Sequence, residues 1–206
     1  DYVEIPQNSN LVVQNRRPFS IDTWVYPRTG STYEEIIDKG SAYTGPGFAF
    51  GFEDGKIIFQ YGTGYGPGGH TTGQTILTLN EWHHIAVTYN GSTAKIYIDG
   101  QLDGSQDVNT FTSDDLGNLY FGRRNDPRGG QPPYWYNGKI DDPAIYNRAL
   151  TDTEIQTIAT LETSDKCEMV SHFEWLKSHF DTDLPAILEE SGYDATVTDR
   201  YSSGPL

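Results

Sequence analysis

Two tight-turn signals, one strand length apart, constrain the fold of this chain more than any other feature of its sequence. In HHIAVTYNGSTAKIYIDGQL, the pairs Asn90-Gly91 and Asp99-Gly100 separate runs in which apolar and polar residues alternate. Asn or Asp followed by Gly favours a hairpin turn, because both residues of the pair tolerate a positive φ. Residues 83–103 are therefore predicted to form a meander of two long strands and the start of a third.

The same alternation runs through most of the chain up to residue 148. FSIDTWVYP has the period of a strand with two different faces, and GFAFGFEDGKIIFQYG reads as two strands joined near Asp54-Gly55. Further strands are expected in LGNLYFGRRND and in PPYWYNGKIDDPAIYNRAL. The 22 glycines and the aromatic fraction of 13% favour many short strands with glycine-rich turns over a helical bundle.

A change of period after residue 148 predicts one short helix, from about 152 to 160. Three apolar residues recur there at helical spacing: Leu150, Ile155 and Ile158. Thr151 or Asp152 can cap the helix, and Glu154 lies in its first turn. Residues 161–206 change composition again, and by themselves they form too small and acidic a segment for an independent core.

The charge and the cysteine content exclude several classes of protein. A net charge of −15, from 29 acidic and 14 basic residues, repels phosphate backbones, so we expect no nucleic-acid partner. With Cys167 as the single cysteine, no intrachain disulfide can form, and no zinc-binding spacing is present. No apolar run approaches the roughly 20 residues that span a membrane. No secretory signal is present, which leaves the compartment open.

Two longer stretches carry a family resemblance. EWHHIAVTYNGSTAKIYIDGQLDGS and YNGKIDDPAIYNRALTDTEIQTI resemble the laminin-G-like (LamG) jelly-roll domains of the concanavalin A-like lectin/glucanase superfamily. DYVEIP, FSIDTWVYP and IIDKG match the earlier strands of such domains in the right order. The resemblance covers residues 1–160. It implies an all-β fold, a two-sheet antiparallel jelly-roll sandwich with a short helix near 152–160.

The rest of the chain, residues 161–206, is expected to be a C-terminal extension. Within it, HFEW and SGYDATVTD resemble the opening strands of a LamG domain, displaced to the C-terminus. These strands could complete their own sandwich by circular permutation or dock into the next copy. The chain could also be a fragment of a tandem array. The remaining alternative is an unrelated acidic appendage.

The resemblance also bears on catalysis, because some superfamily relatives are glycosidases or polysaccharide lyases. Glycoside hydrolysis needs two carboxylates on one concave face. The E-x-D-x-x-E run of the superfamily's glucanases is absent here, and so is a G-x-S-x-G nucleophile elbow. We therefore predict no catalytic residues and no enzyme activity.

A calcium site is the metal site that the resemblance implies, since many family members carry Ca²⁺ near the rim of the sandwich. Hard cations take several carboxylate and carbonyl oxygens. The positions that match the family's site are Asp1, Asp141 and Asp142. The alternative is that one of these carboxylates accepts backbone hydrogen bonds at a strand end.

Two loops offer what a sugar-binding site needs, because an aromatic ring can cover the C–H face of a sugar while polar side chains bond its hydroxyls. In RRNDPRGGQPPYWYNG the candidates are Tyr134, Trp135, Tyr136, Arg123, Arg124, Asn125 and Asp126. In QYGTGYGPGGHTTG they are Tyr65 and His70. The alternative is core packing, since strand alternation would bury at least one ring of the Tyr-Trp-Tyr run.

The sequence thus predicts an extracellular or cell-surface, noncatalytic, lectin-like module with a calcium ion, binding carbohydrate or a surface, adhesion or matrix protein. A structural subunit of a fibre or repeat array, self-associating through its C-terminal segment by strand exchange, is the second interpretation. A polysaccharide-degrading enzyme of the same fold is the third.

Overall fold

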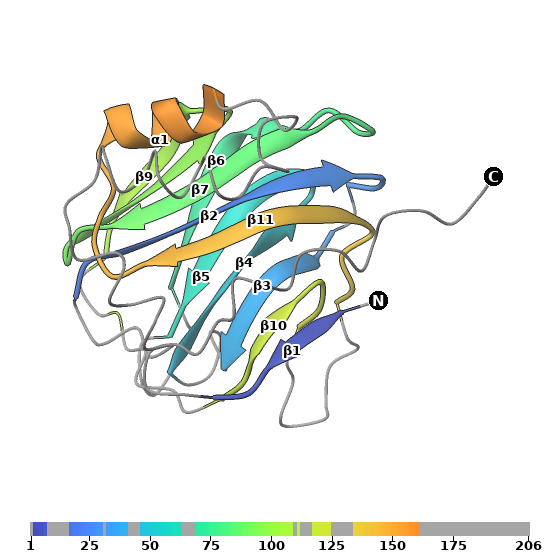
Figure 1. Ribbon diagram of the computed structural model, residues 1–206, viewed down its shortest axis with the longest axis horizontal. Coiled ribbons are helices and arrows are strands. Elements are labelled where there is room, and N and C mark those ends of the chain that lie inside the picture. Colours follow the sequence, from blue (N-terminus) through green and yellow to red (C-terminus); the bar gives the residue numbers. More distant parts are fainter. Residues whose placement is uncertain are drawn as a thin grey trace, which may run out of the picture. The chain divides into compact units, whose positions relative to one another are not determined.

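The predicted sandwich of two antiparallel sheets is confirmed (Figure 1). The computed structural model describes residues 2–7, 17–30, 32–40, 46–62, 69–108, 111, 117–124 and 134–160. Within these residues the chain forms eleven strands followed by one helix. The predictions made for residues 161–206, and for Asp1, Tyr65, Asn125 and Asp126, lie outside the described residues.

One sheet has six strands, paired antiparallel throughout. Its spatial order is β1 (Val3–Ile5), β10 (Leu119–Phe121), β3 (Glu34–Gly40), β4 (Gly47–Glu53), β5 (Lys56–Tyr61) and β6 (Gly69–Ile76). Strands far apart in sequence therefore become neighbours at the β1 edge, where Glu4 lies opposite Tyr120.

The other sheet has five strands, again paired antiparallel. Its spatial order is β11 (Gly138–Tyr146), β2 (Phe19–Pro27), β7 (His83–Tyr89), β8 (Thr93–Ile98) and β9 (Gln101–Asp107). The predicted meander is confirmed as β7, β8 and β9. Its turns take the backbone that their residues favour, with positive φ at Gly91, Asp99 and Gly100.

The core lies between the sheets and is rich in aromatic rings. Alternate residues of β4 point inward, namely Phe48, Phe50 and Phe52. From the other sheet Phe19 packs on Phe48 with ring centroids 6.0 Å apart. Burying rings of this size is a main source of stability, because the hydrophobic gain scales with the apolar area removed from water.

The predicted helix is confirmed as α1 (Asp152–Thr160), which packs on the five-stranded sheet through Ile155 and Ile158. Thr151 is its N-cap: the Thr151 hydroxyl accepts a hydrogen bond from the Glu154 amide at 3.2 Å, and Glu154 Oε2 accepts one from the Thr151 amide at 2.7 Å. Within the described residues, no helix has the length and hydrophobicity needed to cross a bilayer.

Candidate functional site

A short backbone ladder joins the two halves of the sugar-binding motif predicted at residues 123–136. The Arg124 amide donates to the Tyr134 carbonyl at 3.2 Å, and the Tyr136 amide donates to the Gly122 carbonyl at 3.1 Å. Trp135 pairs with Arg123 on one side and with Glu35, the second residue of β3, on the other. Four predicted residues, Arg123, Arg124, Tyr134 and Trp135, are therefore brought together at one end of the six-stranded sheet.

Arg123 lies among the aromatic rings of Tyr2, Tyr120 and Trp135. We call these four residues the Arg123 cluster. Its guanidinium carbon lies 4.4 Å from the ring centroid of Tyr2, 4.7 Å from that of Tyr120 and 5.8 Å from that of Trp135. Each such cation–π contact contributes about 0.5–1 kcal/mol at an exposed site. Tyr2 remains 46% exposed and Trp135 44% exposed, so two of the rings present open surface to a ligand.

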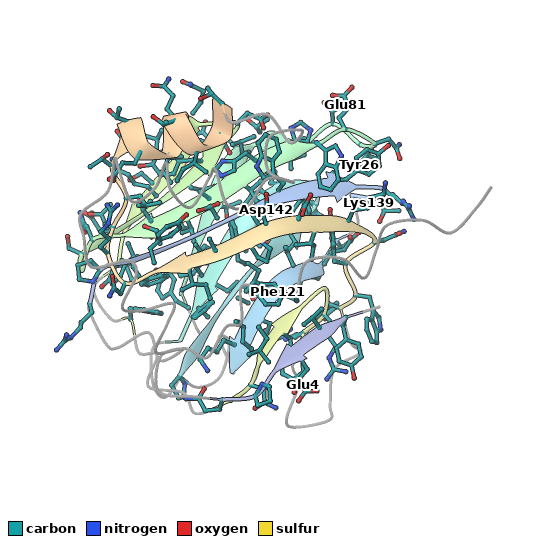
Figure 2. The ribbon with its side chains drawn as sticks, in the orientation of Figure 1. Glu4, Tyr26, Glu81, Phe121, Lys139 and Asp142 are labelled. Carbon is teal, nitrogen blue, oxygen red and sulfur yellow. The ribbon has the colours of Figure 1, made fainter. Side chains whose placement is uncertain are left out.

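The pairing of β1 with β10 holds the Arg123 cluster in place. In β10, Leu119 and Phe121 pack toward the core, so the alternation of the strand turns Tyr120 outward. Glu4 of β1, labelled in Figure 2, accepts a hydrogen bond from the Tyr120 hydroxyl at 3.0 Å. Burial and this hydrogen bond raise the pKa of Tyr120, so its phenol stays a neutral donor.

A second group, the Arg124 cluster, consists of Tyr33, Tyr134 and Arg124. The guanidinium carbon of Arg124 lies 5.3 Å from the centroid of the Tyr134 ring, and the rings of Tyr134 and Tyr33 are 5.5 Å apart. Tyr33 is 40% exposed. A hydrogen bond to Glu53 raises the pKa of Tyr33 and restrains its ring.

Glu35 is a buried acid beside both clusters. It is only 5% exposed, and its Oε2 has no hydrogen-bond partner. Burial raises the pKa of Glu35 to about 7, against the opposing charge of Arg124, which lowers it. Gly51 of β4 is the residue paired with Glu35 on the neighbouring strand. A Cβ atom on Gly51 would lie 2.9 Å from Glu35 Oε2 and 2.2 Å from the Glu34 carbonyl oxygen. This crowding explains the glycine.

The structure separates the other sugar-site candidates from these clusters. Tyr136 is 9% exposed and stacks on Phe52 in the core, with the ring centroids 6.0 Å apart, so it lies apart from the exposed rings. The alternation of the Tyr-Trp-Tyr run buries Tyr136 and leaves Trp135 outside, as the core-packing alternative allowed. His70 is exposed on β6, at the opposite edge of the sheet from β1.

Four residues near the clusters were missed in the sequence: Tyr2, Tyr120, Tyr33 and Glu35. Tyr2 and Tyr120 join Arg123 only because β1 pairs with β10, which no local pattern reveals. The usable signal was the alternation in LGNLYFG, which puts Tyr120 on the face opposite Leu119 and Phe121.

Of the residues predicted for calcium, the structure describes Asp141 and Asp142, at a bulge in β11. Asp142 has a positive φ of 46°, and its amide donates to Asp141 Oδ1 at 3.0 Å, a backbone role close to the alternative considered for these residues. Figure 2 shows Asp142 along the body of β11. No group of three His, Cys, Asp or Glu positioned for a metal occurs within the described ranges. The two carboxylates would therefore need oxygens from elsewhere, and calcium stays a prediction.

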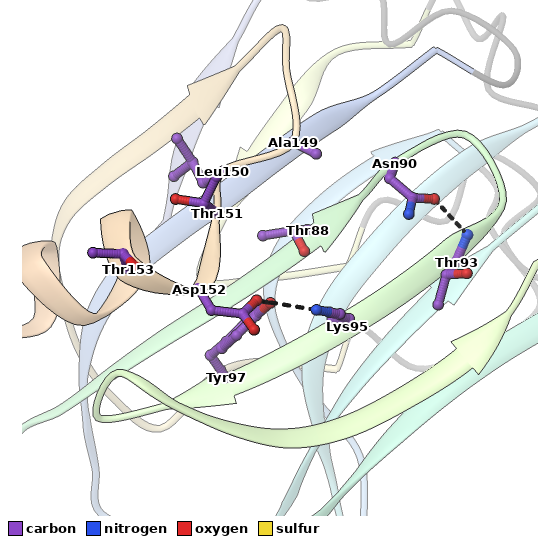
Figure 3. A pocket seen from close by; sticks show the side chains of 10 residues that line it. All are labelled: Thr88, Asn90, Thr93, Lys95, Tyr97, Ala149, Leu150, Thr151, Asp152 and Thr153. Carbon is purple, nitrogen blue, oxygen red and sulfur yellow. Dashed lines mark hydrogen bonds and ion pairs between the residues drawn. The ribbon is translucent and has the colours of Figure 1, made fainter.

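A hollow of about 410 Å³ lies on the five-stranded sheet beside the start of α1 (Figure 3). Its polar groups largely satisfy one another. Asp152 accepts from Lys95 Nζ at 3.0 Å and from the Tyr97 hydroxyl at 2.6 Å, and these hydrogen bonds, that from Tyr97 first, lower the pKa of Asp152. This network holds α1 against the sheet, and among the described residues none of the large exposed hydrophobic side chains lines the hollow.

Several solved structures share this fold, and some of them are described as binding domains. The binding domain of botulinum neurotoxin DC in complex with rat synaptotagmin II matches with a TM-score of 0.61 and 19% identity, over 80% of this chain and 41% of that one. A second structure matches with a TM-score of 0.59 and 20% identity, over 77% of this chain and 39% of that one. Its description says that cell entry of botulinum neurotoxin type C depends on interaction with two ganglioside molecules. A putative carbohydrate binding protein from Bacteroides ovatus matches at 0.58 and 16% identity, over 75% and 43%.

These identities show the fold alone, and the chain spans about two fifths of the length of the three structures. No curated protein sequence matches it. The Laminin_G_3 family, described as the concanavalin A-like lectin/glucanases superfamily, matches residues 1–156, which include all the described strands. The chain therefore belongs to the Laminin_G_3 family.

Proposed function

We propose that this chain is an extracellular, noncatalytic module that binds carbohydrate at the Arg123 cluster. The observation that carries the proposal is the pair of exposed rings, Tyr2 and Trp135, with centroids 5.7 Å apart and an arginine packed against both. An exposed ring covers the C–H face of a sugar and releases the water on both surfaces. The arginine supplies hydrogen-bond donors for hydroxyl groups at the edge of the same ring.

The charge environment of Arg123 supports this role. Within the described residues Arg123 forms no salt bridge, and its buried Nε has no hydrogen-bond partner. Contacts with ring faces hold the guanidinium in position but do not use its N–H groups.

The comparisons support the class of function. One solved structure of the same fold is described as a putative carbohydrate binding protein. A second is described by an interaction with two ganglioside molecules, and a third by a complex with the protein synaptotagmin II. A protein partner is therefore the second candidate for the same exposed rings. These neighbours are binding domains, and they also support the extracellular setting that we propose.

Calorimetric titration, guided by a glycan array, tests the proposal. We expect Trp135→Ala and Tyr2→Ala each to weaken sugar binding by about tenfold or more, as loss of about 1.4 kcal/mol of ring contact would do. Trp82→Ala is the matched control, because Trp82 also packs on a tyrosine, Tyr26 at 5.6 Å, but on the five-stranded sheet. Equal losses in all three variants, or no glycan signal from the wild-type chain, would overturn the proposal.

A further inference from the structure

We infer that the Arg124 cluster is a second sugar subsite, so that the ligand is an uncharged oligosaccharide chain that contacts Tyr33 as well as Trp135. This inference rests on the proposed function of the Arg123 cluster. The two clusters share one composition, an arginine packed over an aromatic ring with a second exposed ring beside it. The ladder between residues 122–124 and 134–136 is made of backbone hydrogen bonds, so its formation does not require an arginine–aromatic contact at two successive positions.

The backbone places the two clusters next to each other. Tyr134 and Trp135 are consecutive, as are Arg123 and Arg124, so their Cα atoms are about 3.8 Å apart. The ladder hydrogen bond from Arg124 to Tyr134 holds the two segments together. On this ladder Arg123 contacts the Trp135 ring and Arg124 contacts the Tyr134 ring, so the two clusters present separate aromatic rings at neighbouring positions. A chain of linked sugars can contact rings of both clusters.

The second cluster is prepared for a ligand in the same way as the first. Tyr33 is fixed through Glu53, and an aromatic ring that is already fixed loses little conformational entropy when a ligand binds. Like Arg123, Arg124 forms no salt bridge within the described part of the chain.

The surrounding charges favour an uncharged sugar. Within the described residues, the carboxyl groups of Glu4, Glu35 and Glu53 lie at the two clusters beside two guanidinium groups, and Glu35 is partly neutral near pH 7 because burial raises its pKa to about 7. The whole chain carries a net charge of −15. A uronic acid or sulfated chain would approach against this field, so acidic polysaccharides are disfavoured.

Titration of the full chain with oligosaccharides of increasing length tests the inference. The probes are β-linked gluco-, manno- and xylo-oligosaccharides of one to six units, with galacturonate oligomers as the acidic arm. We expect affinity to rise about tenfold or more between the monosaccharide and a short chain. Tyr33→Ala should abolish that increase, whereas Trp135→Ala should weaken binding at every length.

Two further variants serve as controls for Tyr33→Ala. Tyr33→Phe keeps the ring and loses only the hydrogen bond to Glu53, so it should retain most of the gain in affinity with chain length, even if Tyr33→Ala perturbs the local fold. Tyr26→Ala is the matched control, because Tyr26 packs on Trp82 and lies 5.1 Å from Lys139 Nζ on the other sheet. Equal affinity at every length, with Tyr33→Ala silent, would overturn the second subsite and leave the proposed function standing. Stronger binding of galacturonate oligomers would overturn the uncharged ligand, and no binding of any sugar would overturn both proposals.

Discussion

The carboxylate of Asp103, on β9, accepts a hydrogen bond of 2.5 Å from the hydroxyl of Thr75, on β6. The same carboxylate accepts from the backbone amides of Gln74 and Thr75, at 2.8 and 3.2 Å. It therefore connects the last strand of one sheet to the last strand of the other. Glycine allows this approach, since a Cβ atom on Gly73 would lie 2.3 Å from Asp103 Oδ2.

We expect Asp103→Ala to lower the free energy of unfolding by about 2 kcal/mol, because it removes several hydrogen bonds to a charged acceptor. Asp103→Asn, which keeps one acceptor oxygen, should cost less. Urea denaturation of both variants measures the difference. Full stability in Asp103→Ala would show that this carboxylate does not hold the two sheets together.

Glu35 predicts a dependence of stability on pH. Its pKa is raised from 4.5 to about 7 on folding, so its contribution is fully present below pH 4.5 and is lost as the pH rises through about 7. The wild type should therefore lose up to about 3 kcal/mol relative to Glu35→Gln over this range, at about 1.4 kcal/mol per pH unit.

Denaturation of the wild type and Glu35→Gln at several pH values checks this dependence. Glu53→Gln, at a residue whose carboxyl is less buried, serves as the control. A difference between wild type and Glu35→Gln that stays constant from pH 4.5 to 7.5 would contradict a raised pKa for this carboxyl.

Calcium remains a prediction that a thermal melt can check. Removal of calcium by a chelator should lower the Tm, because a ligand that binds only the folded state stabilises it. Asp142→Asn should make the Tm insensitive to the chelator. Asn tolerates the positive φ at this position, so the variant tests the carboxylate rather than the backbone. An identical Tm with calcium and with chelator would count against a bound ion.

Mass in solution distinguishes the binding module from the fibre subunit. As a binding module, the chain should sediment with the mass of a single copy over a wide range of concentrations. Strand exchange between copies would instead give polymers that grow with concentration. Analytical ultracentrifugation of the full chain decides between the two, and growth with concentration would favour the fibre.

Local signals in the sequence were enough to predict much of the fold. The pairs Asn90-Gly91 and Asp99-Gly100 predicted the meander because a hairpin turn depends on the residues in the turn itself. The helix was also predicted from a local signal, the helical spacing of its apolar residues, although the sequence left its N-cap open between Thr151 and Asp152. The structure selects Thr151, because the Asp152 carboxylate bonds Lys95 and Tyr97 instead.

The candidate site was predicted only in part, because pairing between distant segments builds it. Alternation predicted that the Tyr-Trp-Tyr run buries a ring, but the pairing with Arg123 decides that Trp135 stays outside. Tyr2 joins Arg123 from the other end of the chain. The face occupied by Glu35 depends on a register shift between Glu35 and Ile37, which strict alternation does not foresee.

The bulge in β11 affects how readily strands of other molecules can pair with this edge of the sheet. Within the described residues β11 is an edge strand of nine residues, the kind of element that can recruit strands from other molecules into aggregates. The left-handed backbone of Asp142 and the missing amide proton of Pro143 interrupt that edge partway along its length. Along the described edge, a strand from another molecule therefore meets no continuous row of donors and acceptors with which to pair.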